Sequence, residues 1–342
     1  MTDSLMDLRS VRFDPEFAPG AYNAVHVCLR IRPDEKVTVI TDRACLEIAA
    51  SLVAELEKLG APYRSFVLEE LAARPMTDMP APVLEDLETS QVSIYAVVAQ
   101  ANELRTRMQM TDVVNRRHIR HAHMVNIERR IMLEGMRADF HKVDELSLKV
   151  LEIAQSAHVI RARTAAGTDL TADMNPDYKW IKTSGIISTK KWGNLPGGEI
   201  FTTPGEVNGT FVIDGVVGDY LCAKYGDLRE TPLTIRIEGN RLTEAYSANL
   251  ELRDEFWRYT HTDANSDRVG EFAIGTNIGL HGVIGNILQD EKLPGVHIAF
   301  GNPYGSHTGA KWDSSTHIDV VGTKFDIWAD DRQIMRAGQF LI

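Results

Sequence analysis

The first part of the chain alternates between short apolar runs and longer segments with helical spacing. Residues 37–40 (Val-Thr-Val-Ile) form a run that predicts a buried strand. From residue 45 to residue 59, apolar positions recur every three or four residues, and Gly60 is placed to end the helix that this spacing predicts. Similar patterns predict strands over 63–68, 92–98 and 158–163 and helices near 103–115 and 143–156. Strands that alternate with helices predict a parallel, Rossmann-like sheet.

No nucleotide-binding loop accompanies this pattern. The turn after the first predicted strand reads Ile-Thr-Asp-Arg-Ala-Cys over residues 40–45, without the G-x-G-x-x-G fingerprint. The chain also has no G-x-x-x-x-G-K-[ST] loop. Nucleotide binding is therefore not supported.

The second part of the chain has a different pattern, in which short β-branched runs are bounded by Gly, Pro and Asn. Only 4 of the 25 glycines lie in residues 1–184, whereas 20 lie between residues 185 and 322. Such runs are typical of antiparallel sheets. We therefore expect an α/β fold with a Rossmann-like domain over residues 1–170 and a mainly antiparallel, β-rich domain over residues 171–342.

A His-x-Asp step lies inside one of these β-branched runs. His317 and Asp319 are separated by Ile318 in the sequence Thr-His-Ile-Asp-Val-Val. Strand side chains alternate between faces, so both polar residues point to one face of the strand. Burying a histidine and a carboxylate side by side is costly unless a partner satisfies them, and a metal ion satisfies both.

Three further segments carry a similar residue. His297 and Glu271 each lie in a predicted strand and are followed two positions later by alanine, which leaves room beside the side chain. Glu199 enters another strand directly after two glycines. The alternative is that each of these residues is a structural group satisfied by its own hydrogen bonds.

The same segments resemble the aminopeptidase T / aminopeptidase S family of metallopeptidases. Residues 194–204 (Asn-Leu-Pro-Gly-Gly-Glu-Ile-Phe-Thr-Thr-Pro) are similar to its Asn-Met-Pro-x-x-Glu-Val-Phe-Thr-x-Pro element. Residues 269–277 resemble its Leu-Gly-Glu-x-Ala segment, 297–304 its His-Leu-Ala-x-Gly-x-x-Tyr, and 317–319 its His-x-Asp. The resemblance implies five metal ligands, namely Glu199, Glu271, His297, His317 and Asp319. It also places Tyr304 where the family keeps an active-site tyrosine, and it implies a homodimer that admits short peptides.

Three carboxylates and two imidazoles exceed the three protein ligands of a single catalytic zinc, and they suit two divalent ions about 3.5–4 Å apart. Since the set has no cysteine, zinc, cobalt and manganese all fit. We therefore expect a metalloaminopeptidase in which water activated by the two ions attacks an N-terminal peptide bond. Tyr304 would donate a hydrogen bond to the developing oxyanion, and Glu199 would carry a proton to the leaving amine.

Two other activities stay open. The chain resembles 2,5-dihydroxypyridine 5,6-dioxygenase, a related branch with this fold, at residues 317–319, and that resemblance implies a single iron and ring cleavage. The dioxygenase branch lacks counterparts of Glu199, Glu271 and His297, which favours a hydrolase here. A hydrolase acting on a small amide other than a peptide is the second alternative.

Charge and composition exclude some partners. The net charge of −11 and the pI near 5.5 argue against nucleic acid. No run of 18 apolar residues predicts a membrane span, and the first ten residues lack the basic and apolar regions of a signal peptide. The three cysteines, Cys28, Cys45 and Cys222, have no CxxC spacing and read as free buried thiols of a cytoplasmic protein.

A basic run over residues 116–123 (Arg-Arg-His-Ile-Arg-His-Ala-His) is also conspicuous. We interpret it as a solvated basic end of a helix or loop. The alternatives are an arginine clamp for an anion and, less favoured because the arginines repel cations, a second metal site.

Overall fold

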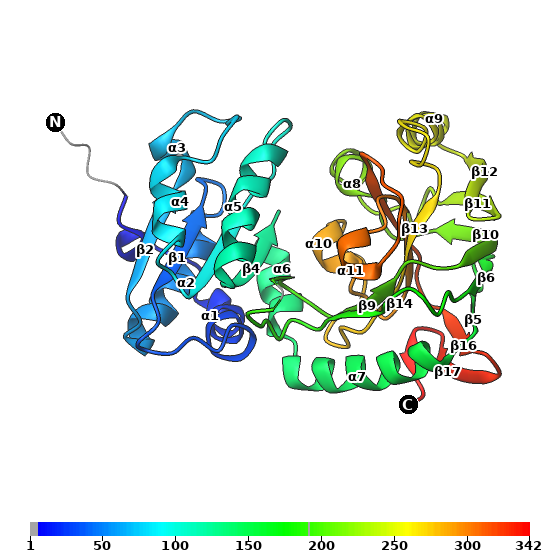
Figure 1. The fold of residues 1–342 in the computed structure, drawn as a ribbon, viewed down its shortest axis with the longest axis horizontal. Coiled ribbons are helices and arrows are strands. Elements are labelled where there is room, and N and C mark those ends of the chain that lie inside the picture. Colours follow the sequence, from blue (N-terminus) through cyan, green and yellow to red (C-terminus); the bar gives the residue numbers. More distant parts are fainter. Residues whose placement is uncertain (1–5, 191) are drawn as a thin grey trace. The chain divides into compact units, whose positions relative to one another are not determined.

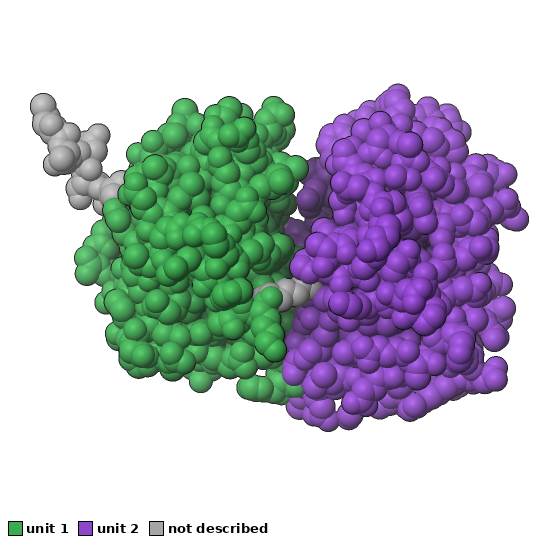
Figure 2. All heavy atoms as spheres, in the orientation of Figure 1, with its two compact units in different colours: residues 1–141, 185–197 green, residues 142–184, 198–342 purple. Residues whose placement is uncertain are grey.

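The computed structural model describes residues 6–190 and 192–342, and the chain forms two compact units (Figures 1 and 2). The first unit consists of the described residues up to 141 and within 185–197. The second consists of residues 142–184 and 198–342. Residues 1–5, on which part of the signal-peptide expectation rests, lie outside the described residues. None of the helices in the described part of the chain combines the length and apolar composition that crossing a bilayer requires.

The first unit is built on sheet A, whose strands are all parallel. Its strand order is β2 (Tyr63–Val67), β1 (Val37–Thr41), β3 (Val92–Val97), β4 (Arg120–Val125) and β8 (Gly193–Asn194). Between these strands the chain forms α2 (Leu46–Leu59), α3 (Leu68–Leu71), α4 (Ala81–Leu87) and α5 (Leu104–Arg117). Shorter helical segments complete the unit, namely η1 (Leu8–Ser10), η2 (Pro15–Phe17), α1 (Ala18–Tyr22), η3 (Asn23–Cys28), α6 (Arg129–Leu133) and η4 (Gly135–Arg137).

This architecture confirms the predicted Rossmann-like fold. Helix α2 ends where the pattern predicted, because Gly60 adopts φ 75° and its N–H bonds back to the last turn. Strands β1, β2 and β3 agree with the predicted runs to within one residue at each end. The predicted strand over 158–163 also forms, as β5 (Val159–Arg163), but it pairs antiparallel in a sheet of the second unit.

The interpretation of residues 116–123 as a solvated basic segment is wrong for its second half. Arg116 and Arg117 are exposed at the end of α5, and His118 reverses the chain in the left-handed region with φ 54°. His121 and His123, however, lie in the interior strand β4 and are only 0% and 8% exposed. The strand was not recognised in the sequence because charged residues surround it, although its alternate positions Ala122 and Met124 are apolar.

The second unit contains two antiparallel sheets. Sheet B has the order β12 (Arg241–Ser247), β11 (Leu233–Glu238), β10 (Glu206–Ile213), β6 (Asp169–Asp173), β5, β16 (Asp326–Ala329), β17 (Arg332–Arg336) and β18 (Gln339–Phe340). Sheet C has the order β15 (His317–Val321), β14 (Gly295–Gly301), β13 (Val269–Gly275), β9 (Glu199–Thr202) and β7 (Ile181–Thr183). The helices are α7 (Phe140–Ser156), α8 (Asp219–Tyr225), α9 (Leu250–Tyr259), α10 (Ile287–Asp290) and α11 (Gly305–Thr308).

The β-rich character predicted for the second half is confirmed, and its core lies against one face of sheet C. A single apolar cluster joins residues of sheet B, such as Phe211 and Ile235, to Phe272 and Ile298 of sheet C. The predicted limit between residues 170 and 171 falls within β6, which pairs with β5 and β10. Which parts of the chain fold independently stays a prediction.

A glycine lets the chain pass close over the other face of sheet C. Gly275 of β13 lies opposite Gly295 of β14 and Glu199 of β9. A Cβ atom at residue 275 would lie 2.0 Å from the carbonyl oxygen of Leu293. The 292–293 backbone therefore requires glycine at this point of the sheet.

We predict that Gly275→Ala lowers the free energy of unfolding by about 1–3 kcal/mol, the usual cost of inserting an atom into a filled space. Chemical denaturation of the purified variant measures the change. Gly282→Ala is the matched control, because its new Cβ would have no neighbour within 4 Å, and a change within about 0.5 kcal/mol is expected. Equal stabilities of the two variants would contradict the packing argument.

Candidate metal centre

The five predicted ligand residues lie on one face of sheet C. Each strand turns its apolar residues, including Ile200, Phe272 and Ile298, into the core, so the intervening residues share the opposite face. The strand register sets out the rows on that face as Glu271–Ala299–Asp319, Gly301–His317, Ala273–His297 and Gly275–Glu199. The small residues between the polar ones leave space over the sheet.

Glu271 lies between the two histidines. One of its carboxylate oxygens is 3.4 Å from Nε2 of His297, and the other is 3.8 Å from Nε2 of His317. Nε2 of His297 is also 3.5 Å from Glu199, and Nε2 of His317 is 3.3 Å from Asp319. Two groups of three potential donors result, Glu199–Glu271–His297 and Glu271–His317–Asp319, each with its donor atoms within 4.8 Å of one another.

His297 offers the clearest evidence that these donors suit a metal. The residue is 1% exposed, and among the described residues neither ring nitrogen has a hydrogen bond of good geometry, although Nε2 lies 3.4 Å from Glu271 and 3.5 Å from Glu199. An unsatisfied buried polar group costs about 1–3 kcal/mol, so such groups are uncommon without a reason. Imidazole nitrogen with neighbouring carboxylate oxygens is a donor set that zinc, cobalt and manganese accept.

His317 is oriented by the backbone. Its Nδ1 lies 2.9 Å from the carbonyl oxygen of Asn302 and donates to it, which leaves Nε2 facing Asp319 and Glu271. A metal-binding histidine is commonly held by such a bond from its second nitrogen. The bond therefore fixes which nitrogen of His317 is available as a ligand.

The crowded charges shift the pKa values of the centre. Burial alone would lower the pKa of His317, but Asp319 and Glu271 raise it to about 10. Burial would raise the pKa of Asp319, but His317 and His297 lower it to about 2. Burial would also raise the pKa of Glu199, but the charges of Lys292 and His297 lower it below its usual value. Without a metal, the centre is held together as buried ion pairs.

Three further polar residues that the sequence patterns did not reveal complete the centre. Lys292 lies 2.7 Å from Glu199 and 2.5 Å from Glu291, and the hydroxyl of Thr183 donates to Glu199 over 2.7 Å. Burial, with the Glu199 and Asp319 carboxylates, raises the pKa of Glu291 to about 8, although Lys292 opposes this. Glu291 also forms a donor group with His297 and Asp319. The charged triplet 290–292 directly before a buried strand was the available signal.

Tyr304 lies next to the candidate ligands. Its ring centroid is 4.4 Å from that of His317, and the residue adopts a left-handed conformation with φ 49° before α11. Tyr304 is 42% exposed, and partial withdrawal of its hydroxyl from water, together with the nearby carboxylates, Asp319 first, raises its pKa above the usual value. The hydroxyl therefore stays protonated at neutral pH and can donate a hydrogen bond.

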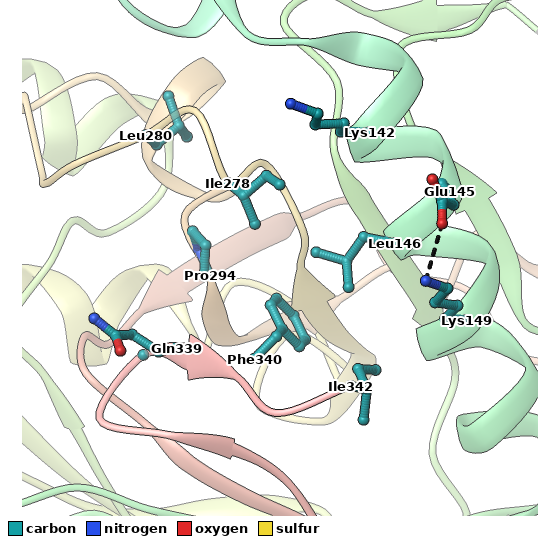
Figure 3. Close-up of a pocket in the computed structure, with 11 residues that line it drawn as sticks. Lys142, Glu145, Leu146, Lys149, Ile278, Leu280, Pro294, Gln339, Phe340 and Ile342 are labelled. Carbon is teal, nitrogen blue, oxygen red and sulfur yellow. Dashed lines mark ion pairs between the residues drawn. The ribbon is translucent and has the colours of Figure 1, made fainter.

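A groove of about 520 Å³ elsewhere on the second unit contains none of these residues. It lies between α7 and the C-terminal strand, and Figure 3 shows Leu146, Ile278 and Phe340 around it, with the Glu145–Lys149 ion pair on α7. A second depression, of about 500 Å³, borders the candidate centre through Asn302 and Tyr304 and continues to Trp312.

The other candidate residues belong to none of these donor groups. In the first unit, His121 bonds to Ser93 over 2.8 Å and to His123 over 3.1 Å, so both histidines have partners within the core. Burial lowers the pKa of His121 to about 3. Cys28, Cys45 and Cys222 are buried and form no disulfide, as expected.

Comparison with known proteins identifies the family. Residues 138–340 match the model of the thermophilic metalloprotease (M29) family. Because this match covers more than half of the chain, the chain belongs to that family. The resemblance found in the sequence is confirmed, and the family implies a divalent metal.

Two known proteins are similar to this chain in sequence or in structure. The 2,5-dihydroxypyridine 5,6-dioxygenase of Pseudomonas putida KT2440 is 26% identical over 200 residues, which is 55% of this chain and only 55% of the length of that relative. The solved structure of the dioxygenase from that organism matches with a TM-score of 0.66 at 15% identity, covering 95% of this chain and 96% of that one. Wild-type AmpT from Thermus thermophilus matches with a TM-score of 0.69 at 16% identity, covering 96% and 99%. At these identities the two structures establish the fold alone.

We predict that metal binding to metal-free protein releases protons at pH 7.5. Because the folded-state pKa of His317 is about 10, the ring is protonated there and must lose its proton to bind a cation. Because the pKa is raised on folding, protonation of His317 stabilises the metal-free protein. This stabilisation is fully present below about pH 6.5 and is lost as the pH rises through 10. Calorimetric titration in two buffers of different ionisation enthalpy measures the release, and identical heats in both would contradict it.

Proposed function

We propose that this protein is a metal-dependent aminopeptidase that removes the N-terminal residue of short peptides. The observation that carries the proposal is the pair of donor groups that share Glu271, because two adjacent groups suit two neighbouring cations. Membership of a metalloprotease family supports the same reaction class. The proposed ligands are Glu199, Glu271, His297, His317 and Asp319. When bound, two divalent ions would polarise the scissile carbonyl and lower the pKa of a water.

The protein side chains supply positioning and proton transfer. Tyr304, with its hydroxyl protonated, is proposed to donate a hydrogen bond to the oxygen on which charge develops. Glu199 is proposed to pass a proton to the leaving amine. Its Oε1 accepts hydrogen bonds from Thr183 and Lys292, which fix the carboxylate, while Oε2 lies toward His297. These roles require the substrate amine and carbonyl to lie over the face of sheet C that carries the proposed ligands.

We predict that His317→Ala and Asp319→Asn each lower kcat/KM by roughly three orders of magnitude, because each removes a ligand while leaving the apolar face of the sheet intact. Circular dichroism and thermal unfolding check that the fold persists. His158→Ala is the matched control, since the His158 side chain is 91% exposed and should retain activity. A variant at 317 or 319 with near wild-type activity in added metal would remove that residue from the ligand set.

The experiment that tests the function compares free and blocked peptides. An aminopeptidase uses the free α-amine to position the substrate, so di- and tripeptides should be cleaved and their N-acetylated forms should react slower by several orders of magnitude. Chromatography of the products measures both rates. Equal cleavage of both forms would replace the aminopeptidase with a general amidohydrolase.

The dioxygenase relative supports a second candidate, a ring-cleaving enzyme with a single iron. The group formed by Glu271, His317 and Asp319 could by itself hold one ion. A metal content of one equivalent, with activity toward dihydroxypyridines in iron alone, would favour this candidate. A homodimer and a cytoplasmic location are further proposals, made from the family resemblance and from the free thiols.

A further inference from the structure

A lysine is buried inside the candidate metal centre. Lys292 is 1% exposed, and its Nζ contacts an oxygen of Glu199 at 2.7 Å and one of Glu291 at 2.5 Å. A buried ammonium group is costly unless anions and hydrogen bonds compensate it. The two carboxylates do so, and they hold the pKa of Lys292 above its usual value although burial opposes this. The lysine is therefore a fixed positive charge beside potential metal ligands.

The backbone holds this lysine in place. The N–H of Lys292 donates to Gln289 over 2.9 Å, and its carbonyl accepts from Asn277 over 3.0 Å. Beneath it, Gly275 leaves the space over the sheet into which the 292–293 segment fits. The side chain thus reaches Glu199 from a turn that is bonded on both sides.

The charge affects the two donor groups unequally. The Nζ of Lys292 lies 2.7 Å from Glu199, which belongs to the group with His297. In the group of Glu271, His317 and Asp319 the lysine acts on Asp319 through space, where its charge helps to lower the pKa of that carboxyl. One oxygen of Glu199 is already shared by Lys292 and Thr183, so only Oε2 is open to a cation. Because the ammonium is buried, water and salt screen its repulsion of a nearby metal weakly.

We propose that Lys292 makes the two metal positions unequal, so that the position at Glu199 and His297 holds a weakly bound, exchangeable divalent ion. The inference rests on the proposed two-metal function. Lys292 acts through Glu199 and is a positioning residue. The enzyme would keep one ion permanently and respond to the free concentration of the second.

Replacing the lysine should reduce the difference in affinity between the two metal positions. In Lys292→Met, Thr183 still bonds to Glu199 and keeps its orientation, while the repelling charge is gone. Glu291, whose carboxylate belongs to a donor group with His297 and Asp319, is also released toward the centre. Both changes favour a cation at the weaker position.

The test is a calorimetric titration of metal-free protein with Mn²⁺, supported by equilibrium dialysis. Wild-type protein should bind one equivalent at least tenfold more tightly than the second. Lys292→Met should tighten the second equivalent at least tenfold and change the first less than threefold. Lys292→Arg, which keeps the charge, should retain the wild-type difference. Thr183→Val is the matched control, because it removes the other bond to the same oxygen without a change of charge and should not tighten the second equivalent.

Equal affinities for both equivalents in wild-type protein would overturn the proposal, and this result needs no variant to fold. An unchanged second affinity in a folded Lys292→Met, or a single equivalent in both proteins, would overturn it as well. One equivalent in wild-type protein but two in Lys292→Met would support it. Failure of the proposed function has a different signature, namely two unequal equivalents with no cleavage of free peptides, and that result supports the role of Lys292.

Discussion

Sheet C has to bury ionisable groups on one face while the other face packs against the core. Phe272, Ile298 and their neighbours exclude water from the inner face. The opposite face places Glu199, Glu271 and His297 where each is at most 6% exposed. Buried charges of this kind are tolerated only when opposite charges, hydrogen bonds or a metal compensate them. The positions of the surrounding loops and of Lys292 follow from that requirement.

The compensation is uneven across the sheet. At one side, Asp319 and His317 form an ion pair, and the backbone of Asn302 fixes the imidazole. At the other side, Glu199 is neutralised by Lys292, and His297 is left without a hydrogen bond of good geometry among the described residues. Glu271 joins the two sides through its two oxygens. Under the two-metal proposal, a centre built in this way would bind its two cations with different strength.

The M29 fold supports more than one chemistry, so the side chains on this face must decide the reaction. The dioxygenase and AmpT match this chain with similar TM-scores of 0.66 and 0.69. A shared fold is therefore no guide to the reaction. In this chain, the features on that face that bear on the reaction are the donor residues, the lysine among them and the tyrosine beside His317.

The sequence by itself determined the local elements and the face on which each candidate ligand lies. Alternation with a period of two is a property of the strand, so the shared face of His317 and Asp319, or of His297 and Ala299, followed from the order of residues. The helix ending at Gly60 and the strands over 37–40, 63–68 and 92–98 were equally local. The strand over residues 120–123 was not predicted, because its arginine and histidine residues suggested an exposed segment. Polar residues are exposed only on average, and these histidines are buried.

Only the tertiary structure decided which strands are neighbours and what neutralises the charges between them. Strand order in sheet C is set by long-range pairing, so the distance from Glu271 to each histidine was not contained in any local pattern. In the sequence Lys292 is one of three adjacent charged residues, and it becomes part of the centre because Gly275 lets its turn lie over the sheet. Spacing along one chain fixes the direction of side chains, whereas contacts between distant segments depend on how the whole core packs.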